Sequence, residues 1–203
     1  MSQIPISAAI LAGGKSTRMG KEDKSLLVIN GITFIESIRN KLGEYFTEIL
    51  VVSDKGERFE EMGFLVYRDL IADKGPLGGL YTALSLSQTK KIFLVACDMP
   101  LLNEVLVSNF ISQVSDEDVL IPLHNSNPEP LFAVYDRNCL PSIINNIESE
   151  NLDMTSFFSG LNIRYLEEKI WREWDSEGIS FRNINTPEDF EFSKKINEGG
   201  GVD

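Results

Sequence analysis

The sequence predicts an α/β fold in which a mostly parallel central sheet is covered by helices on both faces. Short apolar runs alternate with segments of helical spacing along the chain. One run, 91–97 (KIFLVAC), is almost continuously apolar, as is typical of a parallel strand buried on both faces. Ligands of such folds bind beyond the carboxyl ends of the strands, so we expect functional residues directly after the strands.

The first half of the chain is predicted to contain four strands and two helices. Apolar runs bounded by polar or turn residues predict strands at 6–11, 48–53, 64–67 and 91–97. Apolar residues recur at helical spacing over 34–42, which predicts a helix there. A second helix is predicted over 77–86, directly after the pair Gly75-Pro76.

The second half continues this alternation. The patterns predict helices at 103–114, 139–147 and 154–158, and strands at 119–122, 131–135 and 182–184. Asn103 is a candidate N-cap of the first of these helices. A final helix is predicted over 186–196, because Pro187 suits a first turn and the acidic residues after it favour a helix N-terminus.

Length and composition limit the class of protein. A chain of 203 residues favours one domain, which we expect to span 1–196, and the tail 197–203 has no apolar anchor and is predicted to be disordered. The net charge of −12 argues against non-specific binding to nucleic acid or to an anionic membrane. The N-terminus has no signal-peptide pattern and no apolar run could span a membrane, so a cytoplasmic location is expected.

Cysteine and histidine chemistry is not expected. Cys97 and Cys139 have no C-x-x-C spacing, which argues against a zinc site or redox pair and favours buried or near-surface thiols. His124, the only histidine, lies in a polar Asn-Ser-Asn segment and is predicted to be an exposed loop residue. Trp171 and Trp174 lie in an acidic stretch, and we interpret them either as a partner contact or as indoles packed on the rim of the core.

The first apolar run ends in a glycine pair that is followed by a cluster of cations. Gly13 and Gly14 allow the backbone to approach a ligand and to direct N–H groups at it. Four cations follow within ten residues of an acidic chain, namely Lys15, Arg18, Lys21 and Lys24. We therefore interpret this segment as a strand-end loop that binds a polyphosphate.

The spacing of the glycines excludes two other phosphate-binding loops. A P-loop, G-x-x-x-x-G-K-[ST], would need a glycine at the position of Ala9, which argues against a P-loop hydrolase or kinase. The dinucleotide fingerprint G-x-G-x-x-G fails because Gly13 and Gly14 are adjacent and the next glycine is Gly20.

Asp98 directly follows the apolar run 91–97 and is a candidate metal ligand. Mg²⁺ is commonly held by one or two carboxylates together with substrate phosphates. A metal held in this way neutralises charge on the phosphate groups. The alternative is an aspartate that caps the next turn or helix.

These residues are part of longer motifs. Segment 11–24 reads L-A-G-G-x-S-x-R-M-G-x-x-D-K, and 97–100 reads C-D-x-P. Both resemble the signature of the molybdenum cofactor guanylyltransferases, the MobA family of nucleotidyltransferases. Three further segments resemble motifs of the same family, namely the second glycine loop 75–79, the strand 130–135 (P-L-x-A-x-Y) and 183–187 (N-x-N-T-P).

The resemblance extends over most of the chain and implies a Rossmann-like, three-layer nucleotidyltransferase fold. It implies that GMP is transferred from Mg²⁺-GTP to the terminal phosphate of molybdopterin, giving the guanine dinucleotide cofactor and pyrophosphate. Mg²⁺ would be the cofactor, and GTP and molybdopterin the small-molecule partners. Transient contacts with proteins that deliver or accept the cofactor are also expected.

The resemblance implies roles for individual residues as well. Arg18, Lys24 and Asp98 would be catalytic, with Asp98 as the metal ligand. Asn183 and Asn185 would lie on the acceptor side. The nucleotide would be bound by Leu11, Ala12, Gly13, Gly14, Lys24, Ser53, Asp69, Gly75, Gly78 and Asp98.

Several of these positions carry more specific expectations. The Asp69 carboxylate is expected to contact guanine N–H groups or ribose hydroxyls. Gly78 and Gly79 would let a helix pack closely against the first loop. Two positions depart from the family pattern: Ser53 stands where many members carry Asn, and Glu129 where Gln or His is often seen. Ser53 has a shorter reach, and Glu129 is expected to alter the acceptor contacts.

Other functions remain open from the sequence. CTP-dependent cofactor cytidylyltransferases and sugar-1-phosphate nucleotidyltransferases are the nearest, although they more often read L-A-A-G at the first loop. A non-catalytic nucleotide-binding or carrier module is a further alternative, against which the intact Arg18, Lys24 and Asp98 argue.

Overall fold

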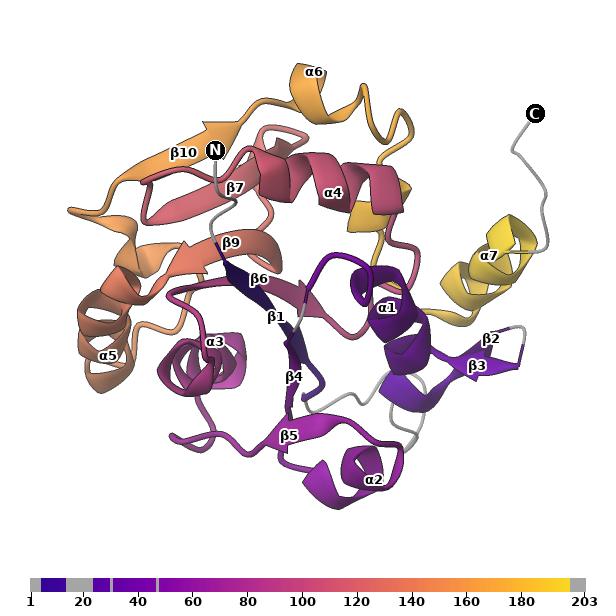
Figure 1. Cartoon of the computed structure of the whole chain (residues 1–203), viewed down its shortest axis with the longest axis horizontal. Coiled ribbons are helices and arrows are strands. Elements are labelled where there is room, and N and C mark those ends of the chain that lie inside the picture. Colours follow the sequence, from indigo (N-terminus) through magenta and orange to yellow (C-terminus); the bar gives the residue numbers. More distant parts are fainter. Residues whose placement is uncertain (1–4, 14–23, 30, 47, 198–203) are drawn as a thin grey trace.

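The strands and helices of this protein are arranged in three layers (Figure 1). The computed structural model describes residues 5–13, 24–29, 31–46 and 48–197. One face of the central sheet is covered by α1 (Phe34–Leu42), α2 (Gly56–Glu61) and α4 (Glu104–Ser112). The other face is covered by α3 (Gly75–Leu86) and α5 (Leu140–Glu148). The predicted α/β class with helices on both faces is therefore confirmed.

Seven strands cross the sheet in the order β10-β7-β9-β6-β1-β4-β5, and β8 pairs with β7 beside them. Their bounds are β1 (Ile6–Leu11), β4 (Ile49–Val52), β5 (Leu65–Tyr67), β6 (Lys91–Ala96), β7 (Val119–His124), β8 (Asn127–Pro128), β9 (Phe132–Asp136) and β10 (Ile163–Leu166). β9 is antiparallel to β6 and β7, β8 is antiparallel to β7, and the other pairs are parallel. The carboxyl ends of β1, β4, β5, β6 and β7 therefore lie at one edge.

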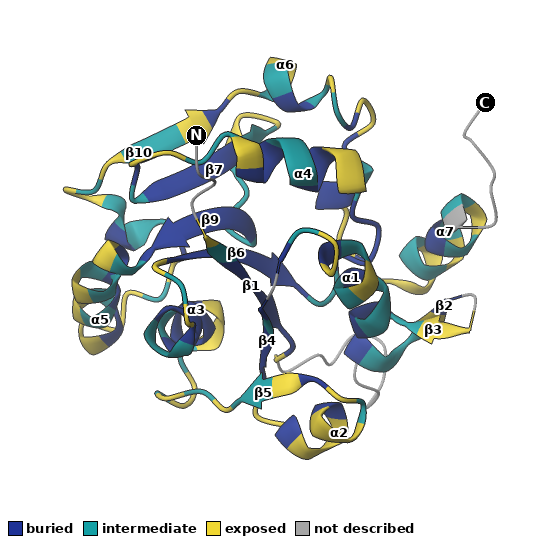
Figure 2. Cartoon of the chain, viewed as in Figure 1, coloured by how far each residue is buried: buried dark blue, intermediate teal, exposed yellow. Residues whose placement is uncertain are grey.

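Strand β6 shows how the core is divided between the two faces. Phe93 and Val95 belong to the buried cluster beneath α1, α2 and α4, whereas Ile92 and Leu94 belong to the cluster beneath α3 and α5. Every residue of β6 is buried (Figure 2). The nearly continuous apolar run is explained by this position, because successive side chains of a strand point to opposite faces and both faces are covered.

Most predicted elements are confirmed, with shifts of a few residues at their ends. The strand at 6–11 and the helix at 34–42 have the predicted bounds. Asn103 caps α4, since its Oδ1 accepts a hydrogen bond of 2.8 Å from the backbone N–H of Val105. The final helix, α7 (Pro187–Asn197), extends through Asn197, which the sequence assigned to the tail. Residues 198–203 lie outside the described residues.

Two predicted elements are wrong. Residues 154–158 form a turn and a short 3-10 segment, because the Asp153 carboxylate accepts hydrogen bonds from the backbone N–H and hydroxyl of Thr155 and holds a local turn. Residues 182–184 form no strand. The backbone N–H of Ile184 donates instead to the carbonyl of Asp98, which follows β6.

Several short elements carry too little sequence pattern to be predicted. Edge strand β10 is mostly half-exposed, and its parallel pairing with β7 is what defines it. The hairpin of β2 (Val28–Ile29) and β3 (Ile32–Thr33) has two residues in each strand. Helices α2 and α6 (Glu168–Trp171) are shorter than the windows in which helical periodicity is visible.

The tryptophans and cysteines are part of the packed structure. Trp171 is fully buried, and its Nε1 donates a 2.8 Å hydrogen bond to the carbonyl of Leu123. Trp174 packs partly buried against the same core, so the core interpretation holds for both indoles. Cys139 is buried and Cys97 is half-buried, as predicted, and neither of these described residues is part of a disulfide. In the part of the chain that the structure describes, no helix is long and apolar enough to cross a membrane.

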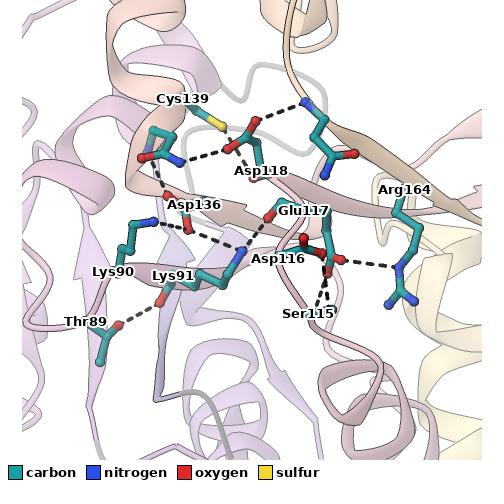
Figure 3. Close-up of polar contacts among 12 residues, drawn as sticks. Thr89, Lys90, Lys91, Ser115, Asp116, Glu117, Asp118, Asp136, Cys139 and Arg164 are labelled. Carbon is teal, nitrogen blue, oxygen red and sulfur yellow. Dashed lines mark hydrogen bonds and ion pairs between the residues drawn. The ribbon is translucent and has the colours of Figure 1, made fainter.

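An ion-pair network lies at the amino end of β6, opposite the edge at which the strand carboxyl ends lie (Figure 3). Asp136 Oδ2 lies 3.3 Å from the Nζ atoms of both Lys91 and Lys90. Lys91 and Asp136 are buried, whereas Lys90 is largely exposed. Lys91 also donates to the carbonyl of Glu117, whose carboxylate pairs with Arg164. The network therefore links β6, β9 and β10 on the side away from the candidate site.

Candidate active site

The strand register aligns four strand ends in one row. Ala96 of β6 pairs with Leu11 of β1, Leu11 pairs with Val52 of β4, and Val52 pairs with Tyr67 of β5. The residues just beyond this row therefore lie along one edge of the sheet. They include four of the predicted site residues, Asp98, Gly13, Ser53 and Asp69.

The start of the glycine loop is held by its two neighbouring strands. The N–H of Ala12 donates to the carbonyl of Val52 at 2.9 Å, and the N–H of Cys97 donates to the carbonyl of Leu11 at 3.0 Å. The buried Ser53 hydroxyl donates to the carbonyl of Ala12 at 2.7 Å. Ser53 thus supports the loop backbone, and its contact with a nucleoside stays a prediction.

The remainder of the signature loop lies outside the described residues. This applies to Gly14 and Arg18, as well as to the side chain of Lys24, whose backbone begins a 3-10 turn (Lys24–Leu26). Their roles therefore stay predictions. Gly13 is described, and a Cβ built on it would meet no atom of the described residues within 4 Å.

Helix α3 begins with the second glycine loop and packs closely on β1. A Cβ at Gly79 would lie 2.9 Å from Leu11 Cδ2, which confirms the prediction that a glycine here lets the helix approach the first loop. A Cβ at Gly78 would lie 2.8 Å from Lys74 Cβ. Gly75 has a φ of +58°, a conformation that L side chains rarely adopt.

Asp69 lies two residues beyond β5, facing α3. The Thr82 hydroxyl lies 3.5 Å from Asp69 Oδ1 and also contacts the backbone of Leu70 and Gly78. Burial and the nearby Asp54 raise the pKa of the Asp69 carboxyl, and the hydrogen bond from Thr82 partly opposes this. Asp69 is therefore a half-buried hydrogen-bond acceptor at the β5 end of the row.

Asp98 lies two residues beyond β6 and joins the loop region to the C-terminal motif. Its backbone carbonyl accepts a 2.8 Å hydrogen bond from the N–H of Ile184. Ile184 is the central residue between Asn183 and Asn185, so both asparagines lie beside the Asp98 segment. Ile184 itself is fully buried in a small apolar cluster with Phe34 and Leu101.

Asp189 in α7 holds the same motif from the other side. Its Oδ2 accepts hydrogen bonds of 3.1 Å from the backbone N–H groups of Asn185 and Thr186, and its Oδ1 lies 3.1 Å from Arg182. The backbone N–H of Asp189 donates in turn to the Thr186 hydroxyl at 3.1 Å, which forms a reciprocal helix cap. Burial opposes ionisation of Asp189, but hydrogen bonds from Asn185, Arg182 and Thr186 outweigh it and lower its pKa.

The donor set suits a magnesium ion that shares its ligands with a substrate. Asp98 supplies a carboxylate at the strand-end row, beside Asn185. Among the residues that the structure describes, no group of three His, Cys, Asp or Glu could hold a metal by itself. Mg²⁺ characteristically takes one or two carboxylates, with phosphate and water completing its shell, so the arrangement fits.

His124 is not the exposed loop residue that the sequence predicts. It ends β7, is partly buried, and its Nδ1 lies 3.1 Å from Oε1 of Glu129. Its ring lies 5.1 Å from that of Phe181 and 5.7 Å from that of Trp171. Sequence reasoning missed this pair, since neither the pairing of β8 with β7 nor the position of Phe181 is visible locally.

A family model and individual related sequences match this chain and agree on the family. A family model described as the MobA-like NTP transferase domain matches residues 8–161. A probable molybdenum cofactor guanylyltransferase from Pelotomaculum thermopropionicum is 34% identical over 183 residues, covering 90% of this chain and 89% of its own length. A relative of the same name from Natranaerobius thermophilus is 35% identical over 196 residues, covering 94% and 95%.

Solved structures share the fold. Molybdopterin-guanine dinucleotide biosynthesis protein A from Archaeoglobus fulgidus superposes with a TM-score of 0.82 at 25% identity, covering 96% of this chain and 100% of its own. CMP:2-keto-3-deoxy-manno-octonic acid synthetase, complexed with CTP, reaches a TM-score of 0.73 at 14% identity over 96% of this chain and 99% of its own. The second likeness shows the fold alone.

Proposed function

Because this chain belongs to the MobA-like NTP transferase family and is a nucleotidyltransferase, we propose that it transfers GMP from Mg²⁺-GTP to the terminal phosphate of molybdopterin. The products would be the guanine dinucleotide cofactor and pyrophosphate. The names of its relatives support a role in molybdenum cofactor biosynthesis. The observation that carries the proposal is the strand-end row, which brings Gly13, Asp69 and Asp98 to one edge of the sheet.

The reaction makes one bond and breaks one. A phosphate oxygen of the acceptor forms a bond to the α-phosphorus of GTP, and the bond from that phosphorus to the bridging oxygen of pyrophosphate breaks. A phosphate nucleophile is already deprotonated at neutral pH, so the step needs no general base. The protein contributes positioning and charge neutralisation.

On the nucleotide side, the glycine loop would bind the phosphates and Asp69 would contact the nucleoside. The backbone at Gly13, which has no atom of the described residues within 4 Å of a built Cβ, would direct its N–H at a phosphate. Asp69 is held against α3 by Thr82, and its carboxylate would accept hydrogen bonds from N1–H and the 2-amino group of guanine or from the ribose hydroxyls. Arg18 and Lys24 would bind the phosphates, Arg through a bidentate fork and Lys as a compact charge.

Asp98 would hold the metal between the two substrates. When bound, Mg²⁺ would neutralise charge on the reacting phosphates and the leaving pyrophosphate. Asp98 is suited to this role because it lies two residues beyond β6 and its backbone carbonyl accepts a hydrogen bond from the N–H of Ile184. Asn183 and Asn185 would contact the acceptor, held in place by Ile184 and Asp189.

The test is pyrophosphate release by the full chain with Mg²⁺ and molybdopterin, comparing GTP with CTP, ATP and UTP. We expect acceptor-dependent release with GTP alone. Release with CTP alone would keep the reaction class and assign the chain to the cytidylyl transferases. Failure of all four nucleotides, by protein that binds GTP, would contradict the proposed reaction.

The base contact is tested separately with Asp69→Asn. An amide cannot accept two hydrogen bonds from the guanine edge, so the preference for GTP over the other nucleotides should fall. Asp73→Asn, on the loop that follows, is the matched control and should leave the preference unchanged. A cytoplasmic location and transient contacts with cofactor-delivery proteins are part of the same proposal.

A further inference from the structure

His124 and Glu129 lie at the same edge of the sheet as Asp98. Val95 of β6 pairs with Phe132 of antiparallel β9. Asp98 lies three residues after Val95 and Glu129 three residues before Phe132, so both extend beyond the same end of adjacent strands. The pair therefore lies on the β9 and β7 side of Asp98, away from the row that serves the nucleotide.

The Glu129 segment is held firmly by its backbone. The N–H of Glu129 donates to the carbonyl of Pro122 at 3.0 Å, and its carbonyl accepts from the N–H of Phe132 at 3.0 Å. The side chain is about three-quarters buried, with 26% of its surface exposed. The backbone of Glu129 is thus held by β7 and β9, and part of its side chain is exposed.

His124 orients the Glu129 carboxylate. Its Nδ1 lies 3.1 Å from Oε1, its Nε2 lies 3.2 Å from the Asn125 amide, and Phe181 and Trp171 hold its ring. Phe181 stands two residues before Asn183, so the pair adjoins the motif that the proposed function assigns to the acceptor. Burial raises the pKa of the Glu129 carboxyl, and the contact with His124 opposes this rise.

We infer that the Glu129 carboxylate, oriented by His124, recognises the pterin ring of the acceptor by accepting hydrogen bonds from the ring's N3–H and 2-amino groups. A carboxylate presents only acceptors, and its two oxygens match two adjacent N–H donors. The inference rests on the proposed function, because it takes the acceptor to be a pterin. It adds a ring-recognition subsite to the acceptor-side asparagines Asn183 and Asn185.

The charge of this surface favours the ring over the phosphate end of the acceptor. Glu129 is acidic and would repel a phosphate, whereas the neighbouring Glu168, which accepts from the Asn125 N–H at 3.0 Å, is paired with Arg172 at 2.5 Å. The predicted cations belong to segment 15–24, which follows β1 in the chain, and β1 lies on the opposite side of β6 from β9. An acceptor that spans this site would therefore place its phosphate toward Asp98 and its ring toward Glu129.

The test changes the hydrogen-bonding pattern of the ligand and, to match it, that of the side chain at position 129. The probes are a 6-substituted pterin monophosphate and its lumazine counterpart, in which a carbonyl replaces the 2-amino group. The wild-type chain should bind the pterin about 10- to 100-fold more tightly than the lumazine, as measured by ligand fluorescence. Glu129→Gln offers one acceptor and one donor, which complements lumazine, so the preference should disappear or reverse.

Steady-state kinetics provide the second measurement. Glu129→Gln should raise the KM for molybdopterin about 10- to 100-fold and leave the KM for GTP unchanged. Glu173→Gln, at an exposed position in the turn after α6, is the control and should change neither constant. His124→Phe keeps a ring in place but removes the hydrogen bond, and should weaken the pterin preference by a smaller factor.

The outcomes separate this inference from the proposed function. An unchanged pterin-to-lumazine ratio and unchanged molybdopterin KM in folded Glu129→Gln would overturn the inference while leaving the enzyme's reaction intact. Absence of acceptor-dependent pyrophosphate release in the wild-type chain would overturn the proposed function itself. Because ligand binding is measured directly, the Glu129 result does not depend on turnover.

Discussion

The N–H of Ile184 donates to the carbonyl of Asp98 at 2.8 Å, so the C-terminal asparagine motif is attached to the end of strand β6. These residues are far apart in the sequence but adjacent at the edge where the strand-end row lies. The bond is reinforced by the burial of Ile184 against Phe34 and Leu101. Through it, the metal-binding candidate and the acceptor-side asparagines form one local unit.

Asp98→Asn is expected to abolish turnover and leave the fold intact. The amide lacks the charge that Mg²⁺ requires, whereas the backbone bond from Ile184 is retained. Pyrophosphate release measures the activity, and thermal unfolding measures the fold. Asp116→Asn, on an exposed bend, serves as the control with normal turnover. Near-normal activity of Asp98→Asn would remove Asp98 from the metal role.

Lys24→Ala is expected to reduce kcat by about 10²- to 10³-fold, because its charge would stabilise the transition state. The melting temperature should stay within the range of Lys195→Ala, a variant at an exposed lysine of α7. Single-turnover kinetics with saturating Mg²⁺-GTP provide the measurement. Loss of thermal stability with normal kcat would instead indicate a structural role for Lys24.

Asp189→Ala should loosen the acceptor motif without disturbing the nucleotide side. It removes the acceptor for the N–H groups of Asn185 and Thr186, which should cost about 0.5–2 kcal/mol of unfolding free energy. The KM for molybdopterin should rise and that for GTP should not. Glu188→Ala, at the neighbouring exposed residue, is the control for both measurements.

Acid should remove the contribution of Asp189. Its pKa is lowered in the folded chain, so its stabilisation is complete above the ordinary value of 3.8 and is lost as the pH falls through the folded value. Urea unfolding of wild type and Asp189→Ala should therefore converge on acidification below about pH 4. A constant difference between the two proteins down to about pH 2 would contradict this linkage.

Two glycine variants should separate helix packing from ligand approach: Gly79→Val tests the packing, and Gly13→Ala tests the approach of the ligand. The side chain at residue 79 would collide with Leu11 and cost about 1–3 kcal/mol of unfolding free energy. A methyl group at residue 13 meets no atom of the described residues, so stability should be kept while GTP binding weakens. Urea unfolding and GTP titration test the two variants. Equal effects on stability would show that the loop is packed differently.

The two lysines around Asp136 should differ in their effect on stability. Lys91→Met removes the buried partner of a buried carboxylate and should cost about 3–5 kcal/mol of unfolding free energy. Lys90→Met removes a largely exposed partner at the same 3.3 Å distance and should cost at most about 1 kcal/mol. Denaturant unfolding of both variants measures the difference. Similar losses would mean that burial does not govern this network.

The strands and their end residues could be predicted because their signals are local. The run 91–97 is apolar throughout since both of its faces are covered, and Asp98 stands out as the first carboxylate after it. The glycine motif 11–24 is likewise continuous in the chain. By contrast, the strand predicted at 182–184 is wrong because the partner of Ile184 is a single carbonyl and not a strand edge.

The sequence by itself determined the fold class, the positions of the main strands along the chain and the strand-end positions of Gly13, Ser53, Asp69 and Asp98. These depend on apolar periodicity and glycine spacing among neighbours in the chain. The tertiary structure alone decided which of these positions meet. The row from Ala96 to Tyr67, the bond from Ile184 to Asp98 and the pairing of His124 with Glu129 depend on strand register and crossovers. Those are set by packing between distant segments, which no local pattern encodes.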